Sequence, residues 1–430
     1  MITSILPTAG NRVAESIPSR RQHSCGSLGR IVLLIPTAWL ATTGLAAEAS
    51  VGLVAITATA AVTGRRAELA ACVILSSIFS ANKVFGLPLP IAICLACAWG
   101  VTLACLMGRT VGPQRKRAGM ALVAAIYLVA ALLLRAPTSV AGQFAALEQG
   151  VILGITIFLC LAPTTRPLRD DWTAPALMAV AIVASAHALL RVSVAGASFE
   201  ETRQLASIFG GSNYVAAVAA AGCITAVILA LTASRGRLIL GIIAGGLAAV
   251  PLLMGSQTST FTLAVLAIGI IGHSKGSRRY VLVAAPVALL IGVAYGGLLS
   301  SRISRGAFQT SWHDRVDLWR AAGTAVFRTP VVGLGPGRLA DSLIARGAAA
   351  HYVHELPLSI LAQYGVAVGL LVLIAMVPRE ALGLVRPESA ALLTLALISL
   401  VEPALETMRL GMIGAALAAT ALWHRAEGPQ

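Results

Sequence analysis

The chain is dominated by long runs of apolar residues, separated by short polar and basic segments. Runs such as 31–47, 281–299 and 358–377 are apolar on every face. They are close to the roughly 20 residues that an α-helix needs to cross a bilayer. Membrane-spanning strands would instead alternate apolar and polar residues in segments of about ten. The pattern therefore predicts an all-α fold, a polytopic transmembrane helix bundle.

About twelve to fourteen spans are expected, because the helix pairs within 31–64 and 388–423 are short for full crossings. The predicted helices cover residues 31–48, 50–64, 67–82, 86–107, 118–134, 141–163, 173–191, 212–232, 237–254, 257–272, 279–299, 357–377, 388–402 and 405–423. The even count places both termini on the same side of the membrane.

With the N-terminus inside, most of the 32 lysine and arginine residues fall on the cytoplasmic side, in accordance with the positive-inside rule. Ala47-Glu48-Ala49 resembles a signal-peptidase site, but the long tail before it favours an uncleaved first span. The expected organisation is a cytoplasmic basic tail (1–30), transmembrane helices 1 to 11 (31–298), one large extracytoplasmic loop (299–356), C-terminal transmembrane helices (357–424) and a cytoplasmic tail (425–430).

Composition supports the membrane interpretation, since 57% of the residues are hydrophobic and only 11% are charged. The net charge of +15 would favour nucleic acid as the partner of a soluble protein, but here the basic residues lie between apolar runs and act as topology signals. We therefore expect no nucleic-acid partner. The seven cysteines fall in the tail or inside predicted spans and imply no disulfide framework.

The large loop breaks the charge rule and carries the candidate chemistry. Residues 314–327 form an amphipathic helix that could lie on the membrane surface, ended by Thr329-Pro330. A glycine-rich turn follows at 333–337, and His351-Tyr352-Val353-His354-Glu355 stands at the start of the next span. The arginines of the loop are Arg302, Arg305, Arg315, Arg320, Arg328, Arg338 and Arg346.

In this order, these motifs resemble the O-antigen ligase and Wzy-type O-antigen polymerase family of bacterial envelope glycosyltransferases. The late loop of that family carries an Arg-x-x-Leu-Trp helix, a Gly-x-Gly turn, and a histidine eleven residues before a glycine. The resemblance covers roughly residues 200–375. The matching positions are Arg315 with Leu318-Trp319, Gly333-Leu334-Gly335, and His354 with Gly365.

A second similarity lies at the start of a middle span. Arg203 and the segment Ile208 to Asn213 look like the arginine, Phe-Gly and Pro-Asn pattern of the family. Two positions depart from the family. Glu355 stands where an asparagine usually follows the histidine, and Gln257 stands near a position that often holds an arginine.

The resemblance implies transfer of a glycan from a polyprenyl (undecaprenyl) diphosphate carrier to a hydroxyl of a lipid, glycan or protein acceptor. The reaction would occur on the outer face of the bacterial plasma membrane, during cell-surface polysaccharide biosynthesis. We expect His354 to act as general base and Arg315 to stabilise the diphosphate leaving group. The expected diphosphate-binding residues are Arg203, Arg191 and Arg320, with His351, Glu355, Asn213 and Gln257 as further candidates.

No cofactor is expected, and the two loop histidines lack a further ligand beyond Glu355 that would favour a metal. His354 has the alternative roles of helix cap or headgroup partner, and Arg315 that of a partner for Asp314 or Asp317. A secondary transporter and a non-catalytic assembly factor of the same pathway remain alternative functions. The residues do not separate a ligase from a polymerase.

Overall fold

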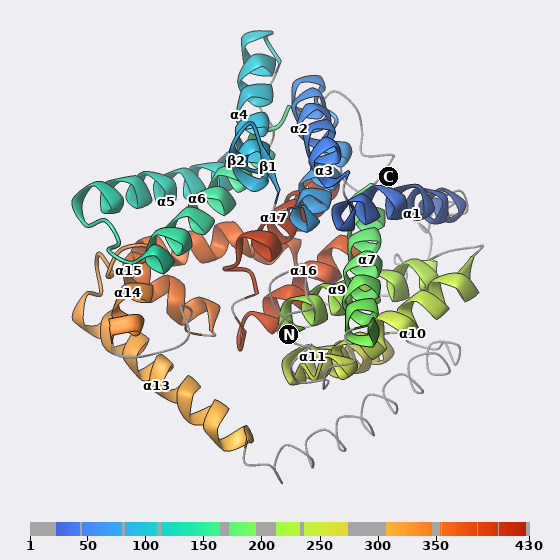
Figure 1. Ribbon diagram of the computed structural model, residues 1–430. Helices are drawn as coiled ribbons and strands as arrows, with labels where there is room; N and C mark the ends of the chain where they lie inside the picture. The colour runs from blue at the N-terminus through green and yellow to red at the C-terminus, as the bar shows by residue number, and fades with distance from the viewer. Residues whose placement is uncertain are drawn as a thin grey trace, which may run out of the picture.

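The computed structural model describes residues 23–43, 45–79, 82–109, 114–163, 172–194, 212–232, 236–273, 307–345, 353, 355–384, 386–402 and 404–426. Almost all of these residues are helical (Figure 1). The single pair of strands in this part of the chain is a short antiparallel hairpin, β1 (Lys83–Val84) and β2 (Leu87–Pro88).

Most helices follow the predicted apolar runs, but the first does not: α1 begins at His23, inside the predicted tail, and ends at Trp39, before the predicted end at residue 48. The first seven are α1 (His23–Trp39), α2 (Ala46–Thr63), α3 (Arg66–Ile78), α4 (Leu89–Leu106), α5 (Arg115–Leu134), α6 (Val140–Leu161) and α7 (Thr173–Val194). Next come α9 (Ser212–Thr232), α10 (Arg237–Leu253), α11 (Gln257–His273), α13 (Ala307–Arg328), α14 (Arg338–Ala345), α15 (Leu356–Met376), α16 (Pro387–Ile398) and α17 (Met408–Ala426). Two 3₁₀ turns, η2 (Leu40–Thr42) and η3 (Arg379–Ala381), complete the set. The span predicted at 279–299 lies outside the described residues.

Seven of the described helices are long and apolar enough to cross a membrane: α2, α4, α5, α6, α7, α9 and α15. The remaining apolar helices are shorter or less apolar. α3 has 13 residues and α16 has 12, so at 1.5 Å per residue neither reaches the thickness of a hydrocarbon core. These dimensions are those of a polytopic helical membrane protein whose short helices pack inside the bundle.

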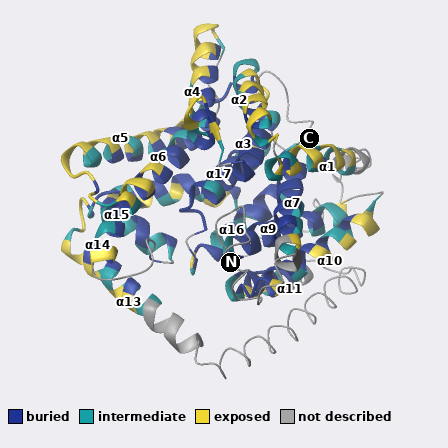
Figure 2. Cartoon of the chain, viewed as in Figure 1, coloured by how far each residue is buried: buried dark blue, intermediate teal, exposed yellow. Residues whose placement is uncertain are grey.

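The centre of the bundle is built from small residues. α9 packs against α7, α10, α11 and α16, while α17 packs against α3, α6 and α16. Alanine is the most frequent buried residue of α9 and α17, which allows the helix axes to approach closely. In Figure 2 the buried positions gather in α7, α9, α16 and α17, whereas α4 and α5 expose many apolar residues, as lipid-facing helices do.

The predicted outer segment contains two helices that pack on the bundle. α13 covers the predicted amphipathic helix and ends before Thr329-Pro330, as predicted. Its apolar stripe, Leu318, Ala322 and Ala325, is buried in a small second core with Leu339 and Leu343 of α14. This face therefore contacts protein and is not available to lie on a membrane surface.

The glycine-rich turn fills a break in α15. Gly365 interrupts the helix with a φ of 74° and a ψ of 175°. The N–H groups of Leu334 and Gly335 donate to the carbonyls of Ala362 (2.8 Å) and Gln363 (3.0 Å), and Val366 N–H donates to the carbonyl of Pro330 (2.8 Å). The backbone groups freed by the break thus find partners in the turn, which a buried irregular backbone requires.

Asp341 of α14 fastens the outer segment to the turn before α6. Its carboxylate accepts from the backbone N–H groups of Thr138 (2.7 Å) and Ser139 (3.0 Å), and from both side-chain hydroxyls. Ser139 in turn caps α6, because its Oγ accepts from Gly142 N–H at 3.0 Å. Burial raises the pKa of Asp341, but these hydrogen bonds outweigh it, so the net pKa lies below the ordinary value.

We expect Asp341→Asn to lower the stability of the protein by about 1 to 3 kcal/mol, because an amide cannot accept from all four donors. The wild-type carboxylate should contribute its full stabilisation of the folded protein above the ordinary aspartate pKa. This stabilisation should disappear as pH falls through the lowered native pKa. Thermal unfolding of both proteins in detergent between pH 3 and 7 measures this stability difference as a function of pH. Equal pH profiles of the two proteins would contradict this assignment.

Candidate functional site

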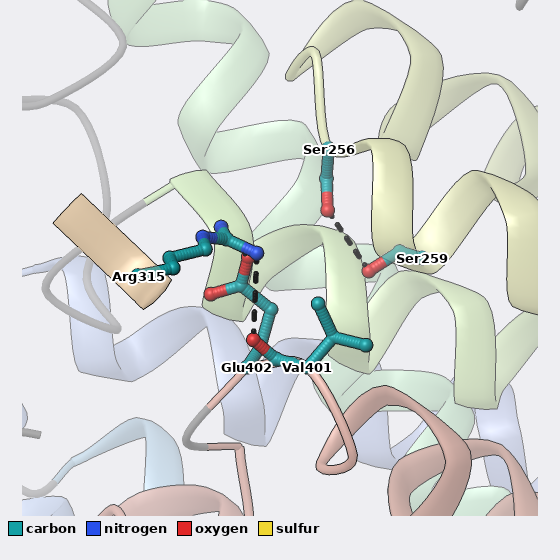
Figure 3. Close-up of polar contacts among 5 residues, drawn as sticks. All are labelled: Ser256, Ser259, Arg315, Val401 and Glu402. Atoms are coloured by element: carbon teal, nitrogen blue, oxygen red, sulfur yellow. Dashed lines mark hydrogen bonds and ion pairs between the residues drawn. The ribbon is translucent and has the colours of Figure 1, made fainter. Parts of the chain in front are cut away.

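Arg315 lies at the centre of the candidate site. It projects from α13 toward the segment that links α16 to α17 (Figure 3). Its Nη2 donates to Glu402 Oε1 at 2.7 Å, and its Nη1 lies 3.5 Å from the carbonyl oxygen of Val401. The side chain of Glu402 is only 7% exposed and that of Arg315 is 22% exposed. The pair is therefore partly withdrawn from water, where a charge-assisted hydrogen bond is stronger than at an open surface.

Of the two aspartates that the sequence raised as partners of Arg315, the side chain of Asp314 is not described, and Asp317 does not pair with Arg315. Asp317 pairs instead with Arg320, at 3.3 Å, and both of these side chains are about three-quarters exposed. Such a pair contributes little to stability. Arg320, a predicted diphosphate ligand, thus lies on the open side of α13, whereas Arg315 points into the bundle.

Two further buried carboxylates share an electrostatic neighbour, Tyr214, with Glu402. Glu148 of α6 and Glu406, in the link before α17, are both nearly inaccessible to water. Glu148 Oε1 accepts from the N–H of Met408 at 3.0 Å, which places a carboxylate at the N-terminus of α17. Tyr214 of α9 lies within electrostatic reach of these glutamates and of Arg409 on α17; the four charged neighbours are Glu402, Glu148, Glu406 and Arg409.

These residues come from parts of the chain that the predicted topology places at the outer ends of spans. The starts of α9, α15 and α17 meet the end of α16, and the N–H of Leu356 donates to the carbonyl of Ser399 at 2.8 Å. Segments as far apart as Glu148 and Glu406 therefore share one site.

Glu355 is the N-cap of α15. Its carboxylate accepts from Leu358 N–H at 2.8 Å, as an N-cap side chain does. Burial raises the pKa of Glu355, and this hydrogen bond partly offsets the effect. Asparagine, which the resembled family usually has here, is also a good cap, so this departure replaces one capping residue with another.

Several predicted site residues lie outside the described part of the chain. His354, His351 and Arg203 belong to this group. Arg191 lies in the last turn of α7, and its side chain is not described. The neighbours of His354 in sequence are described: Val353 is fully buried in the second core and Glu355 caps α15.

Asn213 and Gln257 begin helices. Asn213 is the second residue of α9 and is half-buried. Gln257 is the first residue of α11, and among the described residues its Nε2 is buried without a hydrogen-bond acceptor. Next to it, Ser256 and Ser259 bond to each other at 3.1 Å, in the region drawn with Arg315 in Figure 3. α11 therefore brings a polar end toward the site but no cation in place of the missing arginine.

A buried polar network connects the glycine turn with α6 and α15. Gln363 Oε1 accepts from Gln149 Nε2 at 2.9 Å and from Gly337 N–H at 3.0 Å, while its Nε2 donates to Ser359 Oγ at 3.2 Å. Ser359 faces Glu406. The network holds the first half of α15 and the turn in a fixed relation to the acidic residues.

Within the described ranges, no group of three or more His, Cys, Asp and Glu side chains is arranged to hold a metal ion.

The sequence reasoning did not single out the acidic side of the site. From the sequence alone, Glu148, Glu402 and Glu406 are charges near the ends of predicted spans. A signal was available, because each of them stands beside an apolar run at an end that the charge rule places outside, where Arg315 also lies. Arg409 belongs to the same group.

No model of a known protein family matches the chain, and comparison with characterised proteins finds no significant sequence match.

Proposed function

We propose that this protein is an O-antigen ligase-like or polymerase-like glycosyltransferase that uses a glycan linked to polyprenyl diphosphate. One observation carries the proposal: the arginine of the Arg-x-x-Leu-Trp motif, Arg315, is held by Glu402 inside a site at the predicted outer ends of the spans. The Gly-x-Gly turn and Gly365, the other elements of the resemblance, join in one structure beside it. The proposed location is the bacterial plasma membrane, with both termini in the cytoplasm.

The state of Arg315 fits stabilisation of a diphosphate leaving group. A guanidinium has five N–H donors, and the contacts with Glu402 and Val401 occupy two of them. The other donors remain for phosphate oxygens, while Glu402 fixes the orientation of the group. When the bond between sugar and diphosphate breaks, negative charge grows on phosphate, and an oriented guanidinium stabilises that charge.

The acceptor hydroxyl needs a group that removes its proton. In this proposal His354 is that group, since an imidazole with a pKa near neutrality suits a general base. His354 immediately precedes the cap of α15 in sequence, and Ser359 and Gln363 of that helix connect to the acidic residues and to the glycine turn.

We expect His354→Ala to lower transfer by about 10² to 10⁴-fold without loss of folded protein, because only the proton transfer is affected. The assay uses purified protein in liposomes with polyprenyl-diphosphate-linked glycan from the native cell, and follows release of polyprenyl diphosphate. His351→Ala is the matched control, and its effect should be milder. Equal release by wild type and His354→Ala would end the general-base assignment.

The nature of the glycosylated product decides between a ligase and a polymerase. Glycan on a different lipid or on a protein would identify a ligase, and an extended glycan on the carrier would identify a polymerase.

A secondary transporter is the second candidate. The buried carboxyls Glu148, Glu402 and Glu406 and the broken helix α15 are features that transporters use for coupling ions. In transporters, the carbonyls of a broken helix coordinate the ion, but here those of Ala362 and Gln363 already accept from the glycine turn. Solute uptake by liposomes that release no polyprenyl diphosphate would favour the transporter over the transferase and over a non-catalytic assembly factor.

A further inference from the structure

Glu406 is the one residue of the acidic site that lacks a hydrogen-bond partner in the described structure. The residue is 2% exposed, and both of its carboxyl oxygens are buried and have no hydrogen-bond donor among the described residues. It lies in the link between α16 and α17, outside the membrane-spanning helices. A bare carboxylate in such a place would carry a large desolvation penalty.

The charges around Glu406 do not neutralise it. Glu148 faces it from α6 and Glu355 from the cap of α15, and both repel a negative charge. Ser359 and Tyr364 are the neighbours on α15, and the Ser359 hydroxyl meets no hydrogen-bond geometry with the carboxyl. Glu402 also lies in the link, and Tyr214 of α9 is a further neighbour.

The two described arginines of the site interact with glutamates other than Glu406. Arg315 pairs with Glu402, and Arg409 interacts electrostatically with Glu148. Among the described residues, two guanidinium groups can balance two of the three buried glutamates, so one carboxyl of this described set remains in excess. Of these three glutamates, Glu406 is the one whose carboxylate would accept no hydrogen bond from the described residues.

The ligand that satisfies Glu406 must be very small. Both of its oxygens are fully buried, which leaves no room for a hydrated ion, and no metal-binding group occurs in the described part of the chain. A proton needs no additional space.

We propose that Glu406 is a proton-binding residue of this site: at neutral pH it is a neutral carboxylic acid in the resting protein, and it releases its proton when positive charge or a hydrogen-bond donor reaches the cluster. Burial, with Glu148 and Glu355 acting in the same direction, raises the pKa of Glu406 to about 8, while Ser359 opposes the change. The site thus contains one exchangeable proton close to the Arg315–Glu402 pair. This inference does not depend on glycan transfer.

Infrared spectroscopy of the purified protein tests the protonation directly. The wild type should show a carboxylic-acid C=O stretching band at pH 7 that is lost as pH rises through about 8. The band should be missing from Glu406→Gln and retained in Glu380→Gln, a control at an exposed carboxylate. Absence of a Glu406-dependent band at pH 7, or its loss between pH 4 and 5, would overturn the proposal.

Stability gives a second test with a definite sign. The pKa of Glu406 is raised from 4.5 to about 8, so between these pH values the folded state binds a proton that the unfolded state has released. Stability therefore falls as pH rises across this window and levels off above it. Glu406→Gln and the apolar Glu406→Met should both lose this part of the pH dependence and melt above the wild type at pH 8. A pH profile unchanged in Glu406→Met contradicts the proposal even if Glu406→Gln does not fold.

The two tests separate this inference from the proposed function. If no polyprenyl diphosphate is released but the infrared band depends on Glu406, the transferase proposal is rejected and the proton-binding proposal is retained. Active transfer without the band would do the reverse.

Discussion

Replacing Gly365 with alanine is expected to prevent α15 from packing and to lower stability by about 3 kcal/mol or more. The φ of 74° and ψ of 175° at this position lie in a region that essentially only glycine occupies. A Cβ there would also overlap the carbonyl oxygen of Val331 and approach the N–H of Gly333. Relief of that overlap would pull the glycine turn away from the break and expose backbone groups that no other residue satisfies.

Gly323→Ala is the matched control for this substitution. Gly323 lies within α13, and a Cβ added there meets no atom within 4 Å. Alanine should therefore leave stability unchanged or raise it by up to about 1 kcal/mol through its higher helix propensity. Thermal unfolding and the yield of monodisperse protein in detergent compare the two variants. If Gly365→Ala has the same melting temperature as the wild type, the glycine turn is not the partner of the broken helix.

Separating Arg315 from Glu402 is the second change with a large expected effect. Removal of either partner leaves the other charge without its hydrogen bond in a site that excludes most water. We expect Arg315→Met and Glu402→Gln each to lower stability by about 1 to 3 kcal/mol, with a smaller loss in the double variant than the sum of the two. Denaturant or thermal unfolding of the four proteins gives the coupling energy.

The neighbouring pair of Asp317 and Arg320 provides the control cycle. Both side chains are largely exposed, so Asp317→Asn and Arg320→Met should be additive within error. Additive effects for Arg315 and Glu402 as well would show that their contact makes no net contribution.

The transferase proposal adds a prediction for activity at the same pair. Arg315→Lys keeps the charge but loses the planar set of donors, so transfer should fall by about 10²-fold or more while stability falls little. Full activity of Arg315→Lys would reduce the role of Arg315 to that of a point charge beside Glu402.

Most helices could be predicted from the sequence because each is a local property of an apolar run. The helix predicted at 212–232 matches α9 residue for residue, and α13 ends before Thr329-Pro330 as expected. Proline and glycine act on their own neighbours, so their signals need no tertiary information. How many helices are full spans could not be predicted in this way, since α3 and α16 resemble spans in composition but are too short.

The partners of the site residues could not be predicted. The sequence offered Arg315 two nearby aspartates, but its partner is Glu402, which is 87 positions away. Likewise, the spacing of His354 and Gly365 matched a motif, yet nothing in it indicated that Gly365 breaks α15 and receives the turn at 330–337.

The sequence by itself thus determined the helical class and the position of most helices along the chain, because hydropathy acts along the chain. Only the tertiary structure decided which charges face one another. Whether a buried carboxyl such as Glu402 is paired or, like Glu406, is left to bind a proton depends on the packing of helices that are distant in sequence, and that arrangement sets the local dielectric and the available hydrogen-bond donors.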